Sequence, residues 1–474
     1  MEPTVVRHLY EEVAESISRQ VERGTYRAGE RIPSIRALSR QMGVSITTAM
    51  EAYRLLEDRG VIEARPQSGY YVRSLTTRAP AMPAVSREDM SPVTCCVEKI
   101  VSKVFKDCIG PVSIQLGTNI PHTDLLPVDK LNRCLASAVR RWGNLSVSYS
   151  FPGDERLRTH IAKRAATAGC EITPEDVIIT SGCQEAVSIA LKALCRPGDT
   201  VAIESPMFFN HLQIMQGLDL KVVEIPSSPV EGMSLDALSF VLEDIPVKAC
   251  LMVPNFSNPL GCCMPEKNKA ELVRILTRHG VPLIEDDVYG DLSFSHQRPK
   301  AVKAFDRQGL VVLCSSFSKT LAPGYRVGWM SPGRFKSEIE HQKILCNIAT
   351  ATPPQLAVAE FLACGGYDHH LRRIRRAYAR SISLVTDAVV RYFPEGTNVS
   401  RPSGGFFLWI EMPVQVDSLA LYEHAREHGI SIAPGPIFSV RDKYRNYIRI
   451  SAAHWSDEID AAIRTLGSLA GDMA

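Results

Sequence analysis

Two patterns of apolar residues follow each other along the chain. In the first seventy-five residues the apolar positions recur every three or four residues, whereas after Ile114 short apolar runs alternate with amphipathic stretches. The first pattern is typical of helices with one buried face, and the second predicts buried strands separated by helices. The sequence therefore predicts a small helical domain followed by a larger α/β domain.

The first domain shows the order of elements of a winged helix-turn-helix. A helical stripe covers Val5 to Arg23, and Ser34 is placed to cap a short second helix that ends at Met42. Ser45 then caps a third helix over residues 46–59, and a hairpin follows at 62–72. In this arrangement the third helix enters the major groove of DNA.

The candidate DNA contacts are small hydroxyl residues and arginines. Ser45, Thr47 and Thr48 lie at the exposed start of the third helix, where they can reach phosphates or base edges. Residues 27–73 contain eight arginines and five acidic residues, a local charge of +3, and Arg36 and Arg65 are the main candidates for phosphate contacts. The pattern alone also allows a small interaction domain with solvated arginines.

Three runs in this domain resemble the DNA-binding domain of the GntR family. They are residues 24–36, which include Pro33-Ser34-Ile35-Arg36, the run Tyr53-Arg54-Leu55-Leu56-Glu57, and the hairpin from Arg65 to Val72. The resemblance implies that operator DNA contacts the Pro33 to Arg36 segment, the start of the third helix and the hairpin at 62–72, which is the wing of the domain. The DNA-binding residues expected on this basis are Ser34, Arg36, Ser45, Thr47, Thr48, Arg65 and Gly69.

A linker separates the two parts of the chain. Residues 74–89 contain Pro80 and Pro83 and few large apolar residues, and apolar positions at helical spacing between Ser91 and Cys108 predict a docking helix. We therefore expect a DNA-binding domain at 1–75, a linker with a docking helix at 76–110, and an α/β domain at 111–474. A small α+β subdomain is expected from about 350 to 474.

Six apolar runs predict a mostly parallel sheet in the large domain: 177–180, 200–203, 221–223, 249–253, 282–284 and 311–313. Helical stretches lie between them at 185–194, 235–242 and 266–279. Sheets of this kind are covered by helices on both faces, and ligands bind beyond the carboxyl ends of the strands. The polar side chains that directly follow strands are therefore the candidate site residues.

Some of these residues suit a phosphate and a planar ring. The turn Thr180-Ser181-Gly182-Cys183-Gln184 precedes a helix, so its backbone N–H groups can bind a phosphate, although it can equally be a tight connection. The hydroxyls of Ser316 and Ser318 and the guanidinium of Arg326 offer further phosphate donors. Phe208 can stack on a ring or fill the core.

Other residues suit an aldehyde and a ring nitrogen. Lys319 lies in a serine-rich bend after a strand, and its amine can form a Schiff base, although a solvated lysine is the alternative. Glu285-Asp286-Asp287 ends a strand, where carboxylates need a cationic partner such as a protonated pyridine nitrogen. The alternative is a cluster that caps the next helix. Asn258, in an Asn-Pro turn, offers an amide donor.

Together these residues resemble the site of fold-type I pyridoxal-phosphate enzymes of the aminotransferase class, over residues 113–470. The resemblance implies that Lys319 forms the internal aldimine and that Asp286 pairs with the pyridine nitrogen. It assigns the remaining cofactor contacts to Tyr289 and Asn258 at the ring oxygen, Phe208 at the ring face, and Gly182, Cys183, Ser316, Ser318 and Arg326 at the phosphate. Tyr149 matches an aromatic residue donated by a neighbouring subunit, and Arg449 matches the arginine that binds a substrate carboxylate.

Composition narrows this picture. The chain has 474 residues, a net charge of +2, and hydrophobic and charged fractions of 45% and 22%, typical of a globular protein with two or three domains. Its 13 cysteines show no CxxC spacing, so we expect reduced thiols and no metal site. The sequence has no apolar run of membrane-spanning length and no apolar signal core, and a cytoplasmic location is expected.

A winged helix fused to an aminotransferase-like domain resembles the MocR-type branch of the GntR family. The resemblance implies a homodimeric transcriptional regulator that binds pyridoxal 5'-phosphate and double-stranded operator DNA. It would sense a small amino compound through the Lys319 aldimine. A genuine aminotransferase, with DNA binding secondary or lost, is an alternative, and so is a regulator that responds to cofactor level alone. Residual half-transamination is compatible with the residues present.

Overall fold

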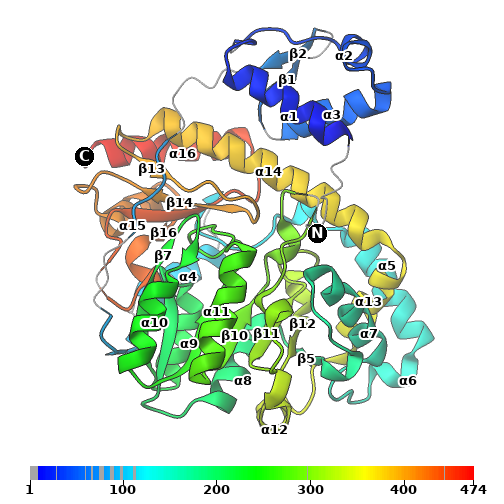
Figure 1. Cartoon of the computed structure of the whole chain (residues 1–474), viewed down its shortest axis with the longest axis vertical. Coiled ribbons are helices and arrows are strands. Elements are labelled where there is room, and N and C mark those ends of the chain that lie inside the picture. Colours follow the sequence, from blue (N-terminus) through cyan, green and yellow to red (C-terminus); the bar gives the residue numbers. More distant parts are fainter. Residues whose placement is uncertain are drawn as a thin grey trace.

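The computed structural model describes residues 9–27, 29–58, 60–65, 68–73, 80–85, 90–96, 100–109, 114–295, 297–441 and 443–474. The start of the first predicted helix at Val5, the turn residues 66–67 and the linker residues 74–79 and 86–89 lie outside this description. Figure 1 shows a small domain above a larger α/β body.

The small domain has the predicted winged helix-turn-helix order. Its elements are α1 (Leu9–Glu22), α2 (Ile35–Met42), α3 (Ile46–Asp58), β1 (Ile62–Arg65) and β2 (Gly69–Val72). Both predicted caps form, because the Ser34 side chain accepts a hydrogen bond from the Ala37 N–H and the Ser45 Oγ accepts one from the Thr48 N–H at 3.0 Å. Tyr53 and Leu56 of α3 are fully buried in its core. Leu55 of the same helix is half-buried: it packs against this core and also faces the large domain.

The large domain is built on a twisted nine-stranded sheet. Its strands are β3 (Val93–Thr94), β5 (Ile178–Thr180), β6 (Thr200–Ser205), β7 (Lys221–Ser228), β8 (Gly232–Met233), β9 (Val247–Met252), β10 (Leu283–Asp286), β11 (Val311–Ser316) and β12 (Gly328–Ser331). The five central strands, in the order β7-β6-β9-β10-β11, are all parallel, as the apolar runs predicted. At one edge β12 runs antiparallel to both β11 and β5.

Helices cover both faces of this sheet, as expected for buried parallel strands. They are α5 (Val128–Arg141), α6 (Gly143–Ser146), α7 (Glu155–Ala165), α8 (Cys183–Leu194), α9 (Phe209–Gly217), α10 (Leu235–Asp244), α11 (Glu266–His279), α12 (Lys336–Asn347) and α13 (Thr352–Ala363). One core lies between the sheet and α8, and a second lies between the opposite face and the pair α10 and α11. The predicted helix at 266–279 has the predicted bounds.

A smaller antiparallel sheet of order β13-β14-β17-β16 forms the second subdomain. The elements of this part are α4 (Ile100–Ile109), β4 (Ile114–Gln115), α14 (Gly366–Tyr392), β13 (Asn398–Val399), β14 (Phe407–Glu411), α15 (Ser418–Glu427), β15 (Ile430–Ser431), β16 (Ala433–Pro434), β17 (Tyr447–Ser451) and α16 (Asp457–Gly471). Val101 and Val104 of α4 lie in its core, so the segment after the linker docks here. Helix α13, which the predicted boundary at about 350 places in this subdomain, packs instead on helices α5 and α7 of the large domain.

The prediction of one continuous helix from Ser91 to Cys108 was wrong at its start. Val93 and Thr94 form the edge strand β3, in which Val93 is paired antiparallel with Val222 of β7. Both residues are β-branched, which favours a strand where a sheet edge is available for pairing. The described helical part begins at Ile100.

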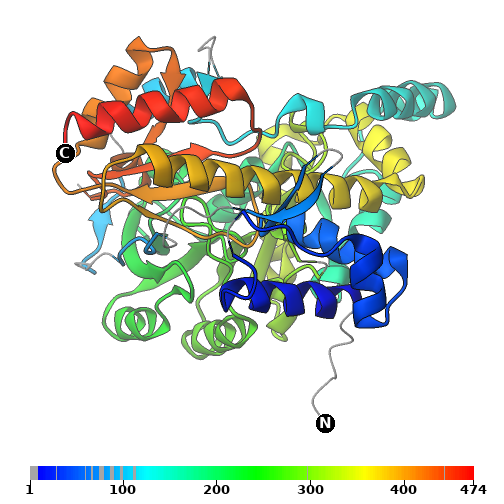
Figure 2. The ribbon, with the colours of Figure 1, turned by 90° about the horizontal axis from the view of Figure 1, so that it is seen from above.

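The long helix α14 carries the DNA-binding domain. It runs beneath the small domain in both ribbon views (Figures 1 and 2), and α3 packs against it. Arg73, just after β2, pairs with Asp387 of α14 at 2.6 Å and donates to Ser383 Oγ at 3.1 Å. Glu51 of α3 pairs with Arg376 of α14 at 3.6 Å. Among the described residues, no helix is both long and apolar enough to span a membrane.

Candidate cofactor site and DNA-binding surface

The predicted cofactor residues meet at one edge of the large sheet. Strands β6, β9, β10 and β11 are adjacent and parallel, so the side chains that follow them converge at their carboxyl ends. One cavity there is lined by nine of the predicted residues: Cys183, Phe208, Asn258, Asp286, Tyr289, Ser316, Ser318, Lys319 and Arg326. Gly182 lies against Arg326 at the same cavity.

Lys319 projects into this cavity from the bend after β11. Its Nζ donates a hydrogen bond to the backbone carbonyl of Asn119, 200 residues away in sequence. Burial and the nearby charges of Arg449 and Arg326 lower the pKa of the Lys319 amine to about 8, although Asp286 opposes the shift. A substantial fraction of the amine is therefore neutral, and hence nucleophilic, near physiological pH.

Asp286 is buried at the end of β10 and held from two sides. Its Oδ2 lies 3.2 Å from Nε2 of His211, and its Oδ1 accepts from the Cys183 thiol at 3.3 Å. The Cys183 pKa is raised well above its ordinary value, first by burial and then by the Asp286 charge, so this thiol stays protonated and donates. The carboxylate is thereby fixed in orientation beside Lys319.

The two neighbouring acids have partners of their own. Asp287 accepts from Arg298 and from the Asn255 amide at 2.8 Å. Glu285 accepts from the backbone N–H groups of Val302 and Lys303, at 2.7 and 2.9 Å. The N–H groups that Glu285 binds are the first two of the short 3-10 helix Val302–Phe305. The helix that directly follows the cluster, Gly290–Leu292, has no side-chain cap, so the cluster does not cap the next helix. Asp286 alone of the three lines the cavity.

Tyr289, Asn258 and Arg449 form a linked group on the side of the small subdomain. The Asn258 amide lies 3.5 Å from the Tyr289 hydroxyl, and its Oδ1 accepts from Arg449 at 3.0 Å. Arg449 is fully buried in β17 and also donates to the carbonyl of Gly117. Arg449 does not itself line the cavity but lies behind Asn258, which does. A buried guanidinium is suited to a carboxylate, which it can bind through two parallel hydrogen bonds.

The opposite end of the cavity is shaped for a phosphate. Gly182 is the N-cap of α8, has a φ of 87°, and provides no side-chain cap, so the first N–H groups of the helix point outward. A Cβ at Gly182 would lie 2.1 Å from the guanidinium of Arg326. That guanidinium donates to Ser318 Oγ at 3.2 Å and to the Ser181 carbonyl at 3.1 Å.

This donor set fits pyridoxal phosphate. The helix N-terminus, Ser318 and Arg326 suit its phosphate, the Asp286 carboxylate suits a protonated ring nitrogen, and the Lys319 amine suits its aldehyde. Two buried polar atoms of α9, Asn210 Oδ1 and His211 Nδ1, have no partner within the described part of the chain, and both residues line the cavity. The site is thus built for a polar ligand.

Among the residues of this site that sequence reasoning missed, two contact its predicted side chains directly. Asn119 forms two hydrogen bonds with the Tyr289 hydroxyl, at 2.6 and 2.9 Å, and its carbonyl accepts from Lys319. His211 holds Asp286. Neither residue lies directly after a strand, which was the signal that found the others. Position on the helix that follows Phe208 was the only available clue to His211.

Tyr149 does not join the cavity of its own chain. Its side chain is 83% exposed, next to Val147 at 87%, and it does not line the cavity. The predicted contribution from a neighbouring subunit is untested by a single chain and stays a prediction.

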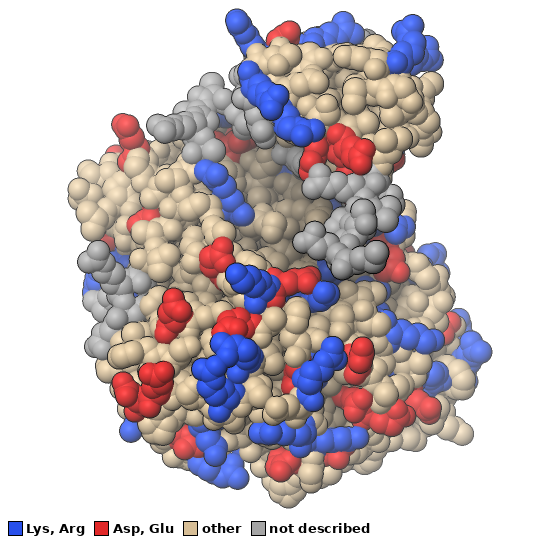
Figure 3. Space-filling view, viewed as in Figure 1, with Lys and Arg blue, Asp and Glu red and all other residues tan. Residues whose placement is uncertain are grey.

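The predicted DNA-binding side chains lie on the small domain. Ser34, Arg36, Ser45, Thr47 and Arg65 are exposed, and Thr48 and Gly69 are partly exposed. In Figure 1, α2 and the wing lie on the side of this domain turned away from α14, and Figure 3 shows basic side chains at its outer edge. Arg65 forms an exposed ion pair with Glu63 at 2.8 Å, and its guanidinium lies over the ring of Tyr71.

The fold and the cavity define a winged helix joined to an aminotransferase-like domain of fold type I. Comparison with known families agrees. The model of "Aminotransferase class I and II" matches residues 112–466, and that of "Bacterial regulatory proteins, gntR family" matches residues 9–72.

The chain belongs to the MocR-like regulators of the GntR family, in which these two domains are fused. It is 38% identical to the HTH-type transcriptional regulator YjiR of Escherichia coli, over 94% of each chain, and 37% identical to YdcR of the same organism, over 97% of this chain and 98% of that one. Among solved structures it is similar to LysN, an α-aminoadipate aminotransferase of Thermus thermophilus complexed with N-(5'-phosphopyridoxyl)-L-leucine. The identity to LysN is 26%, the TM-score is 0.73, and 79% of this chain and 95% of that chain are covered.

Proposed function

We propose that this regulator binds operator DNA as a homodimer in the cytoplasm and senses a small amino compound at Lys319. The observation that carries the proposal is a partly neutral Lys319 amine in the cavity, with the buried Arg449 directly behind Asn258, which lines it. A ligand that carries both an amine and a carboxylate could compete with Lys319 and bind Arg449 at the same time.

The residues of the cavity have separate tasks in this proposal. When bound, pyridoxal phosphate supplies an electrophilic aldehyde and an electron-withdrawing ring. Ser318, Arg326 and the N-terminus of α8 anchor its phosphate, and Asp286, held by His211 and Cys183, keeps a proton at the ring nitrogen. The Lys319 amine would hold the cofactor at its aldehyde, and its Nζ would exchange a proton with an amine bound beside it.

A dimer is supported by the exposed segment that carries Tyr149. Leu145, Val147 and Tyr149 are 48%, 87% and 83% exposed, more apolar surface than a monomer usually leaves in one short segment. In the proposed dimer this segment packs on a second copy, and Tyr149 reaches the partner's cavity. Light scattering should give twice the mass of one chain, and Val147→Asp should reduce it toward a monomer.

The test of sensing is DNA binding measured with and without amino compounds. Footprinting of the region upstream of the gene would supply the operator, and fluorescence anisotropy would measure affinity for it. We expect one class of amino acid to change the affinity of the cofactor-loaded protein but not of Lys319→Ala. An equal change in both proteins would remove Lys319 from the sensing role, and a response to cofactor alone would favour a sensor of cofactor level.

Amino-group transfer is the second candidate function, because lysine, aspartate, tyrosine and arginine are all present at the cavity. A steady-state assay with paired amino and keto acids measures it. Turnover faster than about 1 per second, a rate ordinary for enzymes, would make catalysis the main function. If the cofactor is converted in a single half-reaction without turnover, amino-group transfer is a side activity.

A further inference from the structure

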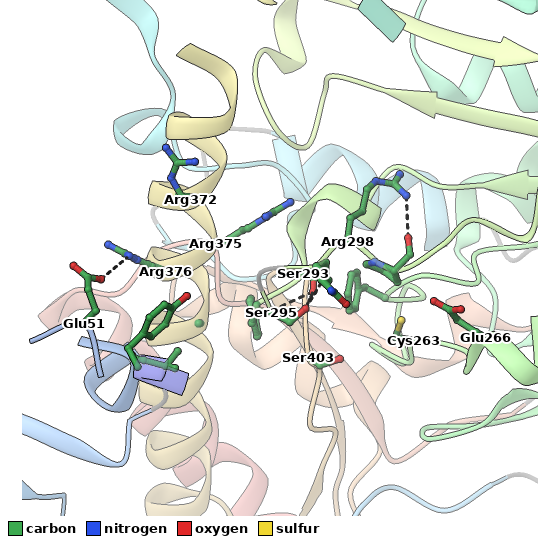
Figure 4. Close-up of a pocket in the computed structure, with 17 residues that line it drawn as sticks. Glu51, Cys263, Glu266, Ser293, Ser295, Arg298, Arg372, Arg375, Arg376 and Ser403 are labelled. Atoms are coloured by element: carbon green, nitrogen blue, oxygen red, sulfur yellow. Dashed lines mark hydrogen bonds and ion pairs between the residues drawn. The ribbon is translucent and has the colours of Figure 1, made fainter. Parts of the chain in front are cut away.

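A second cavity lies between the DNA-binding domain and the aminotransferase-like body. It has a volume of about 470 Å³, within the range of small-molecule sites, and it shares no lining residue with the cavity around Lys319. Tyr10, Glu51 and Leu55 of the small domain form one wall, and α14 forms another. Figure 3 shows the hollow beneath the small domain, and Figure 4 shows the lining side chains.

Part of this cavity is apolar. Leu55 lies on the recognition helix, Ala379 lies on α14, and Phe256 and Phe294 come from loops of the large domain. Leu55 is half-buried, between the core of its own domain and this cavity. These side chains can hold a hydrocarbon or aromatic body.

The α14 wall is cationic. Arg372, Arg375 and Arg376 occupy positions i, i+3 and i+4, so their like charges repel each other on one face of the helix. The acids at the cavity do not balance them. Glu51 pairs with Arg376 at 3.6 Å, whereas Glu266 pairs with Lys300 at 2.8 Å.

Arg375 retains donors that can bind a further group. Its Nε donates to the backbone carbonyl of Asp291, and within the described ranges its terminal nitrogens have no hydrogen-bond acceptor. Burial lowers the pKa of Arg375; the charge of Asp291 opposes this shift, and those of Arg164 and Arg298 add to it. In Figure 4 it extends from α14 toward Arg298, while Arg376 extends toward Glu51.

We propose that this interdomain cavity is a second effector site that binds an organic anion, a carboxylate or phosphate carried on an apolar body. The anion contacts Arg375 and Arg376, and the body packs between Leu55 and Phe294. Such a ligand touches both domains at once and therefore favours the docked position of the winged helix. The proposal does not depend on sensing at Lys319.

The cavity floor is connected to the cofactor site. Phe256 lies two residues before Asn258, which holds Arg449. Arg298 pairs with Asp287, the neighbour of Asp286, and with Asp291 at 2.7 Å. Occupation of the cavity is thus placed to influence both the DNA-binding domain and the cofactor site.

Calorimetric titration of the full-length, cofactor-loaded protein tests the site. The probes are benzoate, phenyl phosphate and the neutral benzamide, each at up to about 10 mM, where a Kd near 1 mM is readily measured. We expect at least one anion to bind about tenfold or more tightly than benzamide, because a charge-assisted hydrogen bond is lost in the neutral probe. Equal binding of benzamide, or no binding of either anion, would overturn the proposal.

Variants locate the binding. Arg375→Gln, Arg376→Gln and the cavity-filling Ala379→Trp should each weaken anion binding about tenfold or more, because each removes a donor or occupies the space. Arg380→Gln, on an exposed turn of the same helix that does not line the cavity, is the matched control and should bind normally. Arg376→Gln replaces an exposed side chain and tests the site even if the other two variants fold poorly.

A carboxylate could instead bind at Arg449, and this outcome is distinguishable. Binding that persists in Ala379→Trp but is lost in Arg449→Lys belongs to the cofactor site and would contradict the proposal. Binding that persists in both Lys319→Ala and Arg449→Lys supports it. Hydrogen exchange supplies an independent measurement, since the bound anion should slow exchange in α3 and α14 and leave α10 unchanged.

Discussion

The two surfaces on which this regulator depends are built in opposite ways. At the cofactor cavity, Asp286, Tyr289 and Arg449 are buried, and each is held by at least two partners. On the DNA-binding domain, Arg36 and Arg65 are exposed, and the partners of the Arg65 side chain in the described part of the chain are Glu63 and Tyr71 of its own hairpin.

The difference reflects the ligands. A small cofactor must be held in one orientation, so its contacts are preorganised and desolvated, and each lost contact is costly. A DNA backbone presents many equivalent phosphates, so exposed and adaptable cations are sufficient, and each contributes a modest amount that depends on salt. Substitutions at the two surfaces should therefore differ in size and in salt dependence.

Lys319→Ala should have the largest effect, because among the described residues that line the cavity it removes the one amine that can attach an aldehyde covalently. We expect complete loss of the visible absorbance of the lysine-bound cofactor, with circular dichroism and DNA binding of the cofactor-free protein retained. A visible band that survives in the variant would contradict the site assignment.

Gly182→Ala should weaken cofactor affinity about tenfold to a hundredfold. The added Cβ would lie 2.1 Å from the Arg326 guanidinium and displace a phosphate donor, and a hydrogen bond to a charged group contributes about 1.5–3 kcal/mol. Gly198→Ala is a matched control, because Gly198 has the same φ of +87° and no atom near its missing Cβ. Fluorescence titration with pyridoxal phosphate compares them, and equal losses would assign the effect to backbone strain alone.

Arg449→Lys should selectively weaken the binding of amino compounds that carry a carboxylate. Loss of the bidentate guanidinium should reduce their affinity about tenfold, because lysine cannot reproduce both hydrogen bonds. Paired probes such as phenylalanine and phenethylamine, followed by cofactor absorbance, separate this effect from general damage. If the two probes lose affinity equally, Arg449 is not the carboxylate site.

Arg36→Ala and Arg65→Ala should weaken operator binding moderately and change its salt dependence. Each lost phosphate contact should reduce the slope of log affinity against log salt by about 0.9. Arg307→Ala serves as the control, since Arg307 is exposed on the large domain, where it pairs with Glu171 at 3.8 Å. If the salt slopes are unchanged, these two arginines do not contact the DNA phosphates.

Substitution of Arg73 or Asp387 should have the smallest effect, because this ion pair joins the two domains and lies at neither the cofactor site nor the predicted DNA contacts. The side chains are 19% and 25% exposed, so a coupling of about 1 kcal/mol is expected from a double-mutant cycle of alanine variants. Hydrogen exchange in α3 should accelerate by a few-fold in either single variant. No acceleration would indicate that the pair does not hold the winged helix on α14.

Short-range features of the molecule were predictable from the sequence. Ser34 and Ser45 cap α2 and α3 as expected, because an N-cap bond joins residues three positions apart. The six apolar runs became strands, and side chains that directly follow them lie in one cavity, because parallel strands share the edge at which they end. The family was identifiable for the same reason, since its motifs are local runs.

Long-range features were decided only by the tertiary structure. Asn119 reaches Lys319 across 200 residues, and His211 approaches Asp286 from a helix, and no local pattern indicates either contact. By sequence pattern alone, Leu55 is an ordinary core residue of a helix, and the arginines of α14 are an ordinary solvated helical face. Their role at an interdomain cavity arises because the winged helix docks on α14, and docking depends on contacts between segments hundreds of residues apart.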